Sequence, residues 1–351
     1  MGWNLYYNRP VSRASLSVVI PAFNAAGWIT QCLHHLKIAL DEAGLDNIQV
    51  VVVDDGSSDG TADEAAGNPE LTVTVLRQSN QGRFLARKNG LDVCTGSHVL
   101  FLDTRVFIHS SSLSFVMPFL ENETTSLWTA HVEANTEKNP IARFWRAIET
   151  VFWRKYMTKP TTTSFGLDDF DYYPKGTTAL ITPVPLIREA IDTFIPTVTD
   201  WRKVNDDTAL LRYAAERTRI NISPNYSCTY NARTNLRAFV RHANHRGSVL
   251  IDGYLRRGTR LNVPIWFVLT VAPLCVVIAA MWWRLALAAL IFGPIVLLGL
   301  VKSLGARGKD SIVLAILFWP FALSYLIGMY WGLWLKIRGN SPPSPLTDGL
   351  S

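Results

Sequence analysis

Four apolar stretches in the first third of the chain are each followed by polar side chains that can bind a ligand. The stretches are residues 16–21, 48–53, 71–76 and 98–102. Their length and unbroken apolar character predict buried strands. The polar groups that follow them are Asn24, Asp55, Arg83, Arg87 and Asp103. Carboxylates accept hydrogen bonds from a base or a ribose hydroxyl, and a guanidinium binds phosphate through two parallel hydrogen bonds. The set therefore predicts a nucleotide site.

Helical patterns separate these stretches, most clearly in residues 26–43. The apolar residues that recur there at helical spacing are Trp28, Ile29, Cys32, Leu33, Leu36, Ala39 and Leu40. Alternating strands and helices predict an α/β fold, with a parallel sheet and crossover helices on its faces. Ligands bind such sheets at the carboxyl ends of the strands, so the polar groups should face one crevice.

Each polar group also has an ordinary structural explanation. DDGSSDGT, residues 54–61, suits a capping turn, and Asn24 and Asp103 suit helix caps. Arg83 and Arg87 lie one helical turn apart and suit a solvated face. The placement of all of them after successive strands favours ligand binding over these separate explanations.

Four motifs resemble, in order and spacing, those of the inverting family 2 glycosyltransferases with the GT-A fold. They are SVVIPAFNAAGWITQCL, VVVDDGSSDGT, NQGRFLARKNGLDVCTGSHVLFLD and NDDTALLRY, within residues 17–247. The resemblance implies a Rossmann-like, mostly parallel sheet and a nucleotide-sugar donor. It implies that Asp55 contacts the nucleobase, that Pro21 and Asn24 line the nucleoside pocket, and that Arg83 or Arg87 lies near the nucleotide.

Asp206 and Asp207 stand where this family has an acidic pair, usually written ED. The resemblance makes Asp207 the base that takes the proton of the acceptor hydroxyl, and Asp206 its neighbour. The alternative is that Asp207 only caps the helix that follows. Both roles are compatible, because a helix N-terminus stabilises the ionised carboxylate that a base requires.

Arg105 occupies the position where the resembling enzymes have the last carboxylate of a DxD motif. That carboxylate binds Mg²⁺ or Mn²⁺, which neutralises the leaving diphosphate. Three explanations stay open: a metal bound through Asp103 with phosphate and water, a positive charge supplied by Arg105 itself, or decayed catalytic machinery. The retained Asp55, Asp103 and Asp207 argue against decay. A guanidinium repels a divalent cation and binds phosphate, which favours reduced or absent metal dependence.

Three uncharged apolar stretches near the C-terminus have about the length that crosses a bilayer. They are residues 262–283, 285–301 and 311–335. The basic residues before the first stretch and between the second and third outnumber those on the other side, which predicts a cytoplasmic N-terminal domain on the plasma membrane. We expect three crossings; the alternative is that 285–301 only dips into the membrane or packs within a homo-oligomer.

Two further stretches indicate contact with the membrane or the acceptor. Residues 139–157 combine aromatic and basic side chains at helical spacing, which suits an interfacial helix or a core helix. Residues 233–261 include Arg241 and Arg246, candidates for a lipid phosphate or the donor pyrophosphate. His242 and His245 lack a third metal ligand and suit surface or phosphate contacts. Gly176 and Thr177 precede an apolar strand and are weaker acceptor-side candidates, as is Glu133.

The predicted organisation has five parts. They are an N-terminal segment (1–14), a GT-A domain (15–232), a basic membrane-proximal linker (233–261), a transmembrane region (262–338) and a polar tail (339–351). The spacing of the four cysteines indicates neither disulfides nor a zinc site, and residues 1–14 lack the apolar core of a signal peptide. The net charge of +6 gathers beside the apolar stretches, which favours anionic lipid over nucleic acid.

The sequence thus predicts a membrane-anchored inverting glycosyltransferase with a nucleotide-sugar donor and a lipid-linked acceptor. The absence of a QxxRW motif and the small number of spans favour a non-processive enzyme over a polysaccharide synthase. A polyprenyl-phosphate sugar synthase is the alternative enzyme, although Asp207 speaks mildly against it. A non-catalytic membrane protein that binds a nucleotide sugar is the alternative from another class, supported by Arg105.

Overall fold

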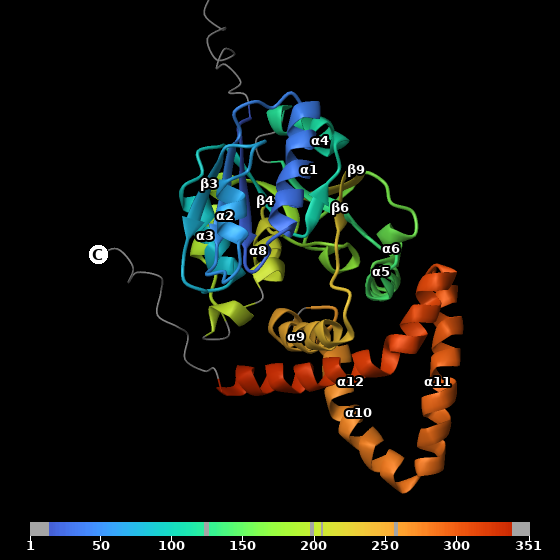
Figure 1. Ribbon diagram of the computed structural model, residues 1–351. Coiled ribbons are helices and arrows are strands. Elements are labelled where there is room, and N and C mark those ends of the chain that lie inside the picture. Colours follow the sequence, from blue (N-terminus) through green and yellow to red (C-terminus); the bar gives the residue numbers. More distant parts are fainter. Residues whose placement is uncertain (1–13, 123–125, 197–199, 205, 256–258, 339–351) are drawn as a thin grey trace, which may run out of the picture.

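The computed structural model describes residues 14–122, 126–196, 200–204, 206–255 and 259–338 (Figure 1). Within these residues a nine-stranded sheet forms the centre of the N-terminal domain. Its first half consists of β1 (Leu16–Ala22), β2 (Gln49–Asp54), β3 (Val73–Arg77) and β4 (His98–Leu102). These strands pair in parallel in the order β3-β2-β1-β4, so the four predicted strands and their parallel pairing are confirmed.

The second half of the sheet is mixed. β8 (Ala179–Pro183) pairs with β4 in the antiparallel direction, and β6 (Leu127–Ala134) follows it. β9 (Ile220–Tyr230) pairs in parallel with β6 and antiparallel with two short strands, β5 (Val106–Ile108) and β7 (Thr163–Phe165). The α/β, Rossmann-like fold is therefore confirmed, and its fully parallel part is the half that carries the predicted nucleotide loops.

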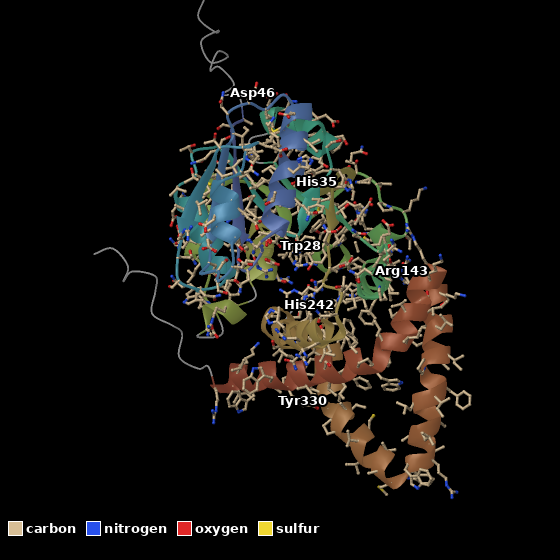
Figure 2. All side chains as sticks on the ribbon, viewed as in Figure 1. Trp28, His35, Asp46, Arg143, His242 and Tyr330 are labelled. Atoms are coloured by element: carbon tan, nitrogen blue, oxygen red, sulfur yellow. The ribbon has the colours of Figure 1, made fainter. Side chains whose placement is uncertain are left out.

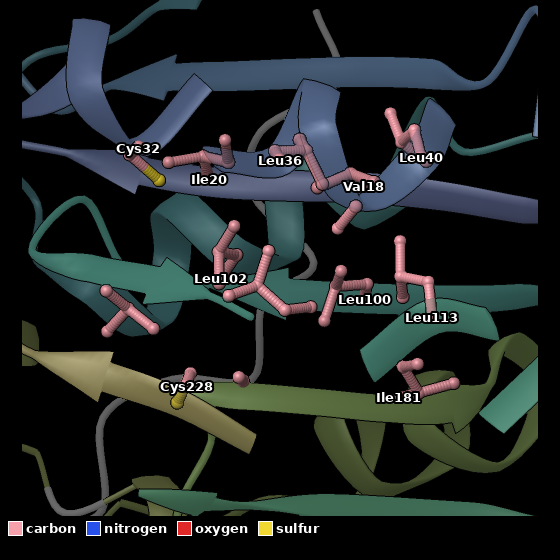
Figure 3. Close-up of a cluster of buried hydrophobic side chains, with 14 of the residues drawn as sticks. Val18, Ile20, Cys32, Leu36, Leu40, Leu100, Leu102, Leu113, Ile181 and Cys228 are labelled. Carbon is pink, nitrogen blue, oxygen red and sulfur yellow. The ribbon is translucent and has the colours of Figure 1, made fainter. Parts of the chain in front are cut away.

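Helices cover both faces of this sheet because successive side chains of each strand point to opposite sides. Val18 and Ile20 of β1 pack with α1 (Trp28–Glu42) and α4 (Ser111–Asn122), as Figure 3 shows for Val18, Ile20 and Leu36. Val19 packs on the opposite face, with α3 (Arg83–Asp92), α7 (Val184–Asp192) and α8 (Asp206–Ala215). A short helix, α2 (Thr61–Ala66), follows the loop after β2. The two clusters fix the ends of β1, β2 and β4, where the site lies.

Two helices lie between this domain and the C-terminal helices. α5 (Pro140–Phe152) and a single turn, α6 (Arg154–Met157), meet at a break at Trp153, and α9 (Leu236–Tyr254) packs beside α5. Phe144 and Trp145 of α5 are buried against Phe239 of α9. The predicted helix over 139–157 is thus present, and these two aromatic side chains belong to a core.

Three helices form the C-terminal part: α10 (Asn262–Met281), α11 (Trp283–Ser303) and α12 (Gly308–Arg338). They contain 20, 21 and 31 residues, and each is long enough and apolar enough to cross a membrane. The break between the first two lies at Trp282, so Arg284 belongs to α11. In Figure 1, α10 and α11 form a hairpin that projects away from the sheet, whereas α12 returns beneath α9. Two short 3₁₀ helices, Phe170–Tyr172 and Trp201–Lys203, complete the described elements.

Candidate functional site

The loops that follow β1 and β2 are joined by hydrogen bonds of Asn24. Its backbone has a φ of 46°, a left-handed conformation that asparagine tolerates better than most residues. The side-chain Oδ1 accepts from the amide of Ser58 at 2.9 Å, and its own amide donates to Ser57 Oγ at 3.0 Å. Pro21 is buried in β1 opposite Val53 of β2. The two loops therefore form one wall at the carboxyl ends of the strands.

Asp55 connects this wall to the loop after β3. Its buried carboxylate accepts from the amides of Gln81 at 2.8 Å and Gly82 at 2.9 Å, and from Gln78 Nε2 at 2.7 Å. Gly82 has a φ of 99°, and a Cβ there would lie 2.7 Å from Arg202 Cα. The Asp55 carboxylate thus holds the loop after β3 against the loop after β2. Its contact with a nucleobase stays a prediction.

We expect Asp55→Asn to weaken nucleotide binding and lower stability. An amide group cannot accept hydrogen bonds at both of its heavy atoms, so one buried backbone N–H loses its partner, at a cost of about 1–3 kcal/mol. Titration calorimetry with UDP and GDP, together with thermal unfolding, measures both effects. Asp46→Asn is the matched control, because Asp46 is exposed at the end of the domain opposite α9 (Figure 2). Equal nucleotide affinity in the wild type and Asp55→Asn would contradict the assignment.

Arg87 is the centre of a cluster that joins three elements. Its side chain is 1% exposed, and it donates from Nη2 to Asp103 Oδ1 at 2.9 Å and from Nη1 to Asp207 Oδ1 at 3.1 Å. The three residues come from α3, from the end of β4 and from the start of α8. The predicted base and the predicted DxD carboxylate are therefore brought together by a buried cation.

Asp207 is held in the ionised state. Burial raises its pKa, but the positive charges of Arg83 and Arg87 and the hydroxyl hydrogen bond of Thr177 outweigh burial and hold the pKa at about 2. Arg83 Nη2 lies 3.9 Å from Asp207 Oδ2, whereas Thr177 Oγ1 donates to Oδ1. A carboxylate fixed in this way can orient and receive the proton of an acceptor hydroxyl. The side chain of Asp206 lies outside the described residues.

Arg105 lies beside the cluster and not in it. Its guanidinium carbon is 4.3 Å from the centre of the Trp28 ring, and its carbonyl accepts from the amide of Asn231 at 2.9 Å. Burial and then the positive charge of Arg233 lower the pKa of Arg105, while Tyr230 opposes them. An arginine does not lose its proton in proteins, so Arg105 and Arg233 place two positive charges near the turn at Asp103. Such a pair is stabilised by a bound anion.

The acceptor-side candidates separate into two groups. Thr177 is buried and bonds Asp207, and the carbonyl of its neighbour Gly176 accepts from Thr129 Oγ1 at 3.2 Å. Arg241 and Arg246 are exposed on α9, and the Arg246 guanidinium lies 4.7 Å from the centre of the Trp145 ring. Thr177 therefore belongs to the site, and the described contacts of Arg246 are on α5 and α9.

Of the two histidines of α9, His242 is half-buried beside Trp145 of α5 and His245 is exposed, and their contact with phosphate stays a prediction. Burial first, then Arg246 and other cations that include Arg83, lower the pKa of His242 to about 3. Burial and Arg83 also lower the pKa of His245. His242 stacks near Trp145, with 5.1 Å between ring centres.

The side chains present do not form the divalent-metal site that a DxD motif provides. Asp103 Oδ1 is occupied by Arg87, and the second carboxylate is replaced by Arg105, whose charge disfavours a dication. Among the described residues, His, Cys, Asp and Glu side chains form no group of three or more that could hold a metal ion. The donor set therefore fits a diphosphate beside guanidinium groups better than a metal ion with two carboxylate ligands.

Sequence reasoning missed several residues that build this site. Trp28 was seen only as part of a helical apolar pattern, although it stacks on Arg105. Gln78 directly follows β3 and bonds Asp55, so its place after a strand was the available signal. Asn231 and Arg233 follow β9, a strand whose position in the sheet the sequence did not reveal.

Known proteins are similar to this chain in its N-terminal part. The sequence model for glycosyl transferase family 2 matches residues 17–178. The glycosyltransferase GlyG of Streptococcus pneumoniae is 30% identical over 92 residues, which cover 25% of this chain and 29% of that protein. A PGL/p-HBAD biosynthesis glycosyltransferase of Mycobacterium bovis is 33% identical over 116 residues, which cover 32% of this chain and 44% of that protein. The chain therefore spans less than half of the length of either relative.

A solved structure extends the likeness of the fold. The mannosyltransferase PcManGT from Pyrobaculum calidifontis, solved in complex with GDP-Man and Mn²⁺, superposes with a TM-score of 0.56 at 18% identity. The superposition covers 88% of this chain and 88% of that chain. The two chains thus share a fold over most of their lengths.

Proposed function

We propose that this chain, whose residues 17–178 are a family 2 glycosyltransferase domain, transfers a sugar from a nucleotide-sugar donor to a lipid-linked acceptor at a membrane. The observation that carries the proposal is the cluster of Asp103, Arg87 and Asp207 at the carboxyl ends of the strands. It combines an ionised carboxylate with buried positive charge beside the nucleotide loops.

The reaction is a direct displacement with inversion. The acceptor oxygen bonds to the anomeric carbon while the bond from that carbon to the diphosphate oxygen breaks, and the bonding pair leaves with the diphosphate. Asp207 takes the acceptor proton. Its Oδ1 already accepts from Thr177 and Arg87, so we assign Oδ2 as the oxygen that receives it.

We assign to Arg105 and Arg233 the role of stabilising the negative charge on the leaving diphosphate. Positive charge near that oxygen lowers the barrier because negative charge develops there during the displacement. Asp103, paired with Arg87, holds the donor side of the site in place.

The membrane part of the proposal rests on the C-terminal helices. Three helices have the length and composition to span a bilayer, and α9 lies between them and the site. We place the catalytic domain on the cytoplasmic face of the plasma membrane because Lys302, Arg307 and Lys309 lie at the junction of α11 and α12, on the domain side. An acceptor attached to lipid would be delivered to this side. A hydroxyl acceptor gives Asp207 its role, which favours this function over polyprenyl-phosphate sugar synthesis.

Detergent-purified protein should transfer sugar to a total membrane lipid extract in EDTA. We would test UDP-, GDP- and dTDP-sugars, because the base is not fixed by Asp55 alone. Arg105→Ala should lower kcat by roughly 10²-fold, since one cation near the leaving group is lost. Arg77→Ala is the control, an exposed arginine paired with Asp63.

Two outcomes would contradict parts of this proposal. Activity abolished by EDTA and restored by Mn²⁺ would keep the transferase and overturn the assignment of Arg105. Nucleotide binding without turnover of any donor, even by hydrolysis, would support the non-catalytic alternative. Arg105→Asp restores the DxD pattern and should make the remaining activity sensitive to EDTA.

A further inference from the structure

α12 has two distinct faces along its whole length. The buried residues of one face are Asp310, Ser311, Leu314, Ala315, Ser324, Gly328, Met329 and Gly332. The exposed apolar residues of the other face are Ile312, Ile316, Trp319, Leu323, Ile327, Tyr330, Trp334 and Ile337, and Trp331 beside them is exposed as well. The second set recurs every three or four residues and therefore forms one continuous stripe. The uniform hydropathy of the sequence concealed this division.

The buried face of α12 is covered by charged helices of the catalytic side. A Cβ on Gly328 would lie 1.9 Å from the carbonyl oxygen of Asn244, and one on Gly332 would lie 2.6 Å from that of Ser248. α9 and α12 are therefore in backbone contact and run in the same direction, since residues 244 and 248 meet residues 328 and 332 in order. α9 also carries Arg241 and His245. Burying these groups in hydrocarbon would cost several kcal/mol.

Both ends of α12 are attached to the same side of the molecule. At its start, Asp310 accepts from Arg146 of α5 at 2.7 and 2.9 Å, and Arg143 lies 3.5 Å away. At its end, Lys336 donates to the carbonyl of Leu255, next to the last residue of α9, at 2.7 Å. The 31 residues span roughly 46 Å, more than the roughly 30 Å of a hydrocarbon core. A crossing helix would have carried one of these ends to the far face.

α10 and α11 differ from α12 in each of these respects. Within their most apolar windows 11% and 6% of the residues are buried, compared with 28% for α12. They project as a hairpin from the domain (Figure 1), and Arg284 is the only basic residue near its tip. The other basic residues lie away from this tip. Lys302, Arg307 and Lys309 are at the junction of α11 and α12, and Lys336 and Arg338 are in the last turn of α12. If α12 does not cross, all five lie on the side of the catalytic domain, which satisfies the positive-inside rule.

We propose that only the α10–α11 hairpin enters the bilayer and that α12 lies in the plane of the membrane, with its exposed stripe in one leaflet. The tryptophan and tyrosine side chains of the stripe suit the interface between headgroups and hydrocarbon. Arg154, Lys155 and Arg260 line a cavity of about 380 Å³ beside Leu304 at the end of α11, and supply positive charge for anionic headgroups. The chain then ends on the same face as the catalytic domain. This inference rests on the proposed membrane anchoring and not on the transfer reaction.

Protease accessibility of tags on the full-length protein tests this arrangement. Different epitope tags, each behind a protease site, are placed before Met1 and after Ser351, and membranes are prepared as inverted vesicles and as intact spheroplasts. We expect both tags to be cleaved in one preparation and both to be protected in the other. Two tags on opposite faces would mean three crossings and would overturn the proposal.

A second measurement separates this inference from the proposed function. Alkaline carbonate should leave the wild type in the membrane, because a hairpin resists extraction. Val276→Asp in α10 should release it by placing a charge in hydrocarbon, whereas Ile327→Asp in α12 should leave it bound, because an in-plane helix can turn that residue toward the headgroups. Extraction of the wild type, or equal release of both variants, would overturn the arrangement. None of these results depends on finding a substrate.

Discussion

Replacing Asp207 with Asn should lower kcat by about 10³-fold while the protein stays folded and binds nucleotide. Asparagine has nearly the same shape as aspartate, so the start of α8, where Asp207 lies, should be preserved. It also accepts hydrogen bonds from Thr177 and Arg87, the two donors to Oδ1. What is lost is the negative charge that receives the acceptor proton. The effect should therefore appear in kcat and not in the affinity for the nucleotide.

Transfer to the lipid extract and nucleotide titration measure these two quantities. Asp63→Asn is the matched control, because Asp63 is 82% exposed and pairs only at the surface with Arg77. A small reduction in kcat would contradict the catalytic role and would leave Asp207 with a structural role at the start of α8. Lost nucleotide affinity would assign it to binding, whereas a modest fall in melting temperature is expected, because the ionised carboxylate also stabilises the fold.

Arg87→Met should have the largest effect on stability. The buried guanidinium is the partner of Asp103 and Asp207, and its loss leaves two neighbouring carboxylates without their common counter-ion. Removing one partner of a buried ion pair costs about 3–5 kcal/mol. Lys88→Met is the control on the same helix, because its i,i+4 pair with Asp92 is partly exposed and is worth about 0.5 kcal/mol or less.

The pH dependence of this loss identifies its cause. In the wild type the pKa of Asp207 is about 2, below that of an unfolded aspartate at about 3.9, so the stabilisation is present above that value and is lost as the pH falls through 2. In Arg87→Met the pKa of Asp207 should rise from this value, because the charge and the hydrogen bond of Arg87 are lost while Arg83 and Thr177 remain, and protonation then relieves part of the penalty. The variant should therefore be least stable relative to the wild type near pH 7 and recover toward pH 4. A penalty independent of pH would indicate lost packing only, and the double variant with Asp103→Asn should recover stability at pH 7.

The first half of the domain could be predicted because its signals are local. Apolar runs identified β1, β2, β3 and β4, and the rule that ligands bind at strand ends identified Asp55 and Asp103. The Arg87 contacts required more, because Asp103 and Asp207 meet it across 16 and 120 positions of sequence. Spacing carries no information about such meetings. The family resemblance supplied Asp207, and nothing in the sequence indicated that Thr177 would hold it.

The C-terminal part shows a different limit. Hydropathy measures how apolar a segment is and not what covers it, so α10, α11 and α12 gave the same signal. The glycines at 328 and 332 were uninformative until α9 was seen against them. The aromatic residues of α5 are likewise compatible with an interfacial helix or a core helix. The contact of Phe144 with Phe239 of α9 is what identifies a core helix.

The backbone contact between α9 and α12 has a consequence for the products. α12 is in backbone contact with α9 at Gly328 and Gly332 and is paired with Arg146 of α5 through Asp310, so on our proposal these helices hold the catalytic domain at a fixed tilt to the membrane. On our proposal, the sugar donor is therefore presented at one constant height above the leaflet. A lipid-linked glycan that has grown by several residues carries its terminal hydroxyl beyond that height. Chain length, in addition to chemical identity, would then decide which acceptor is glycosylated, and each acceptor would receive its sugar at a single step of assembly.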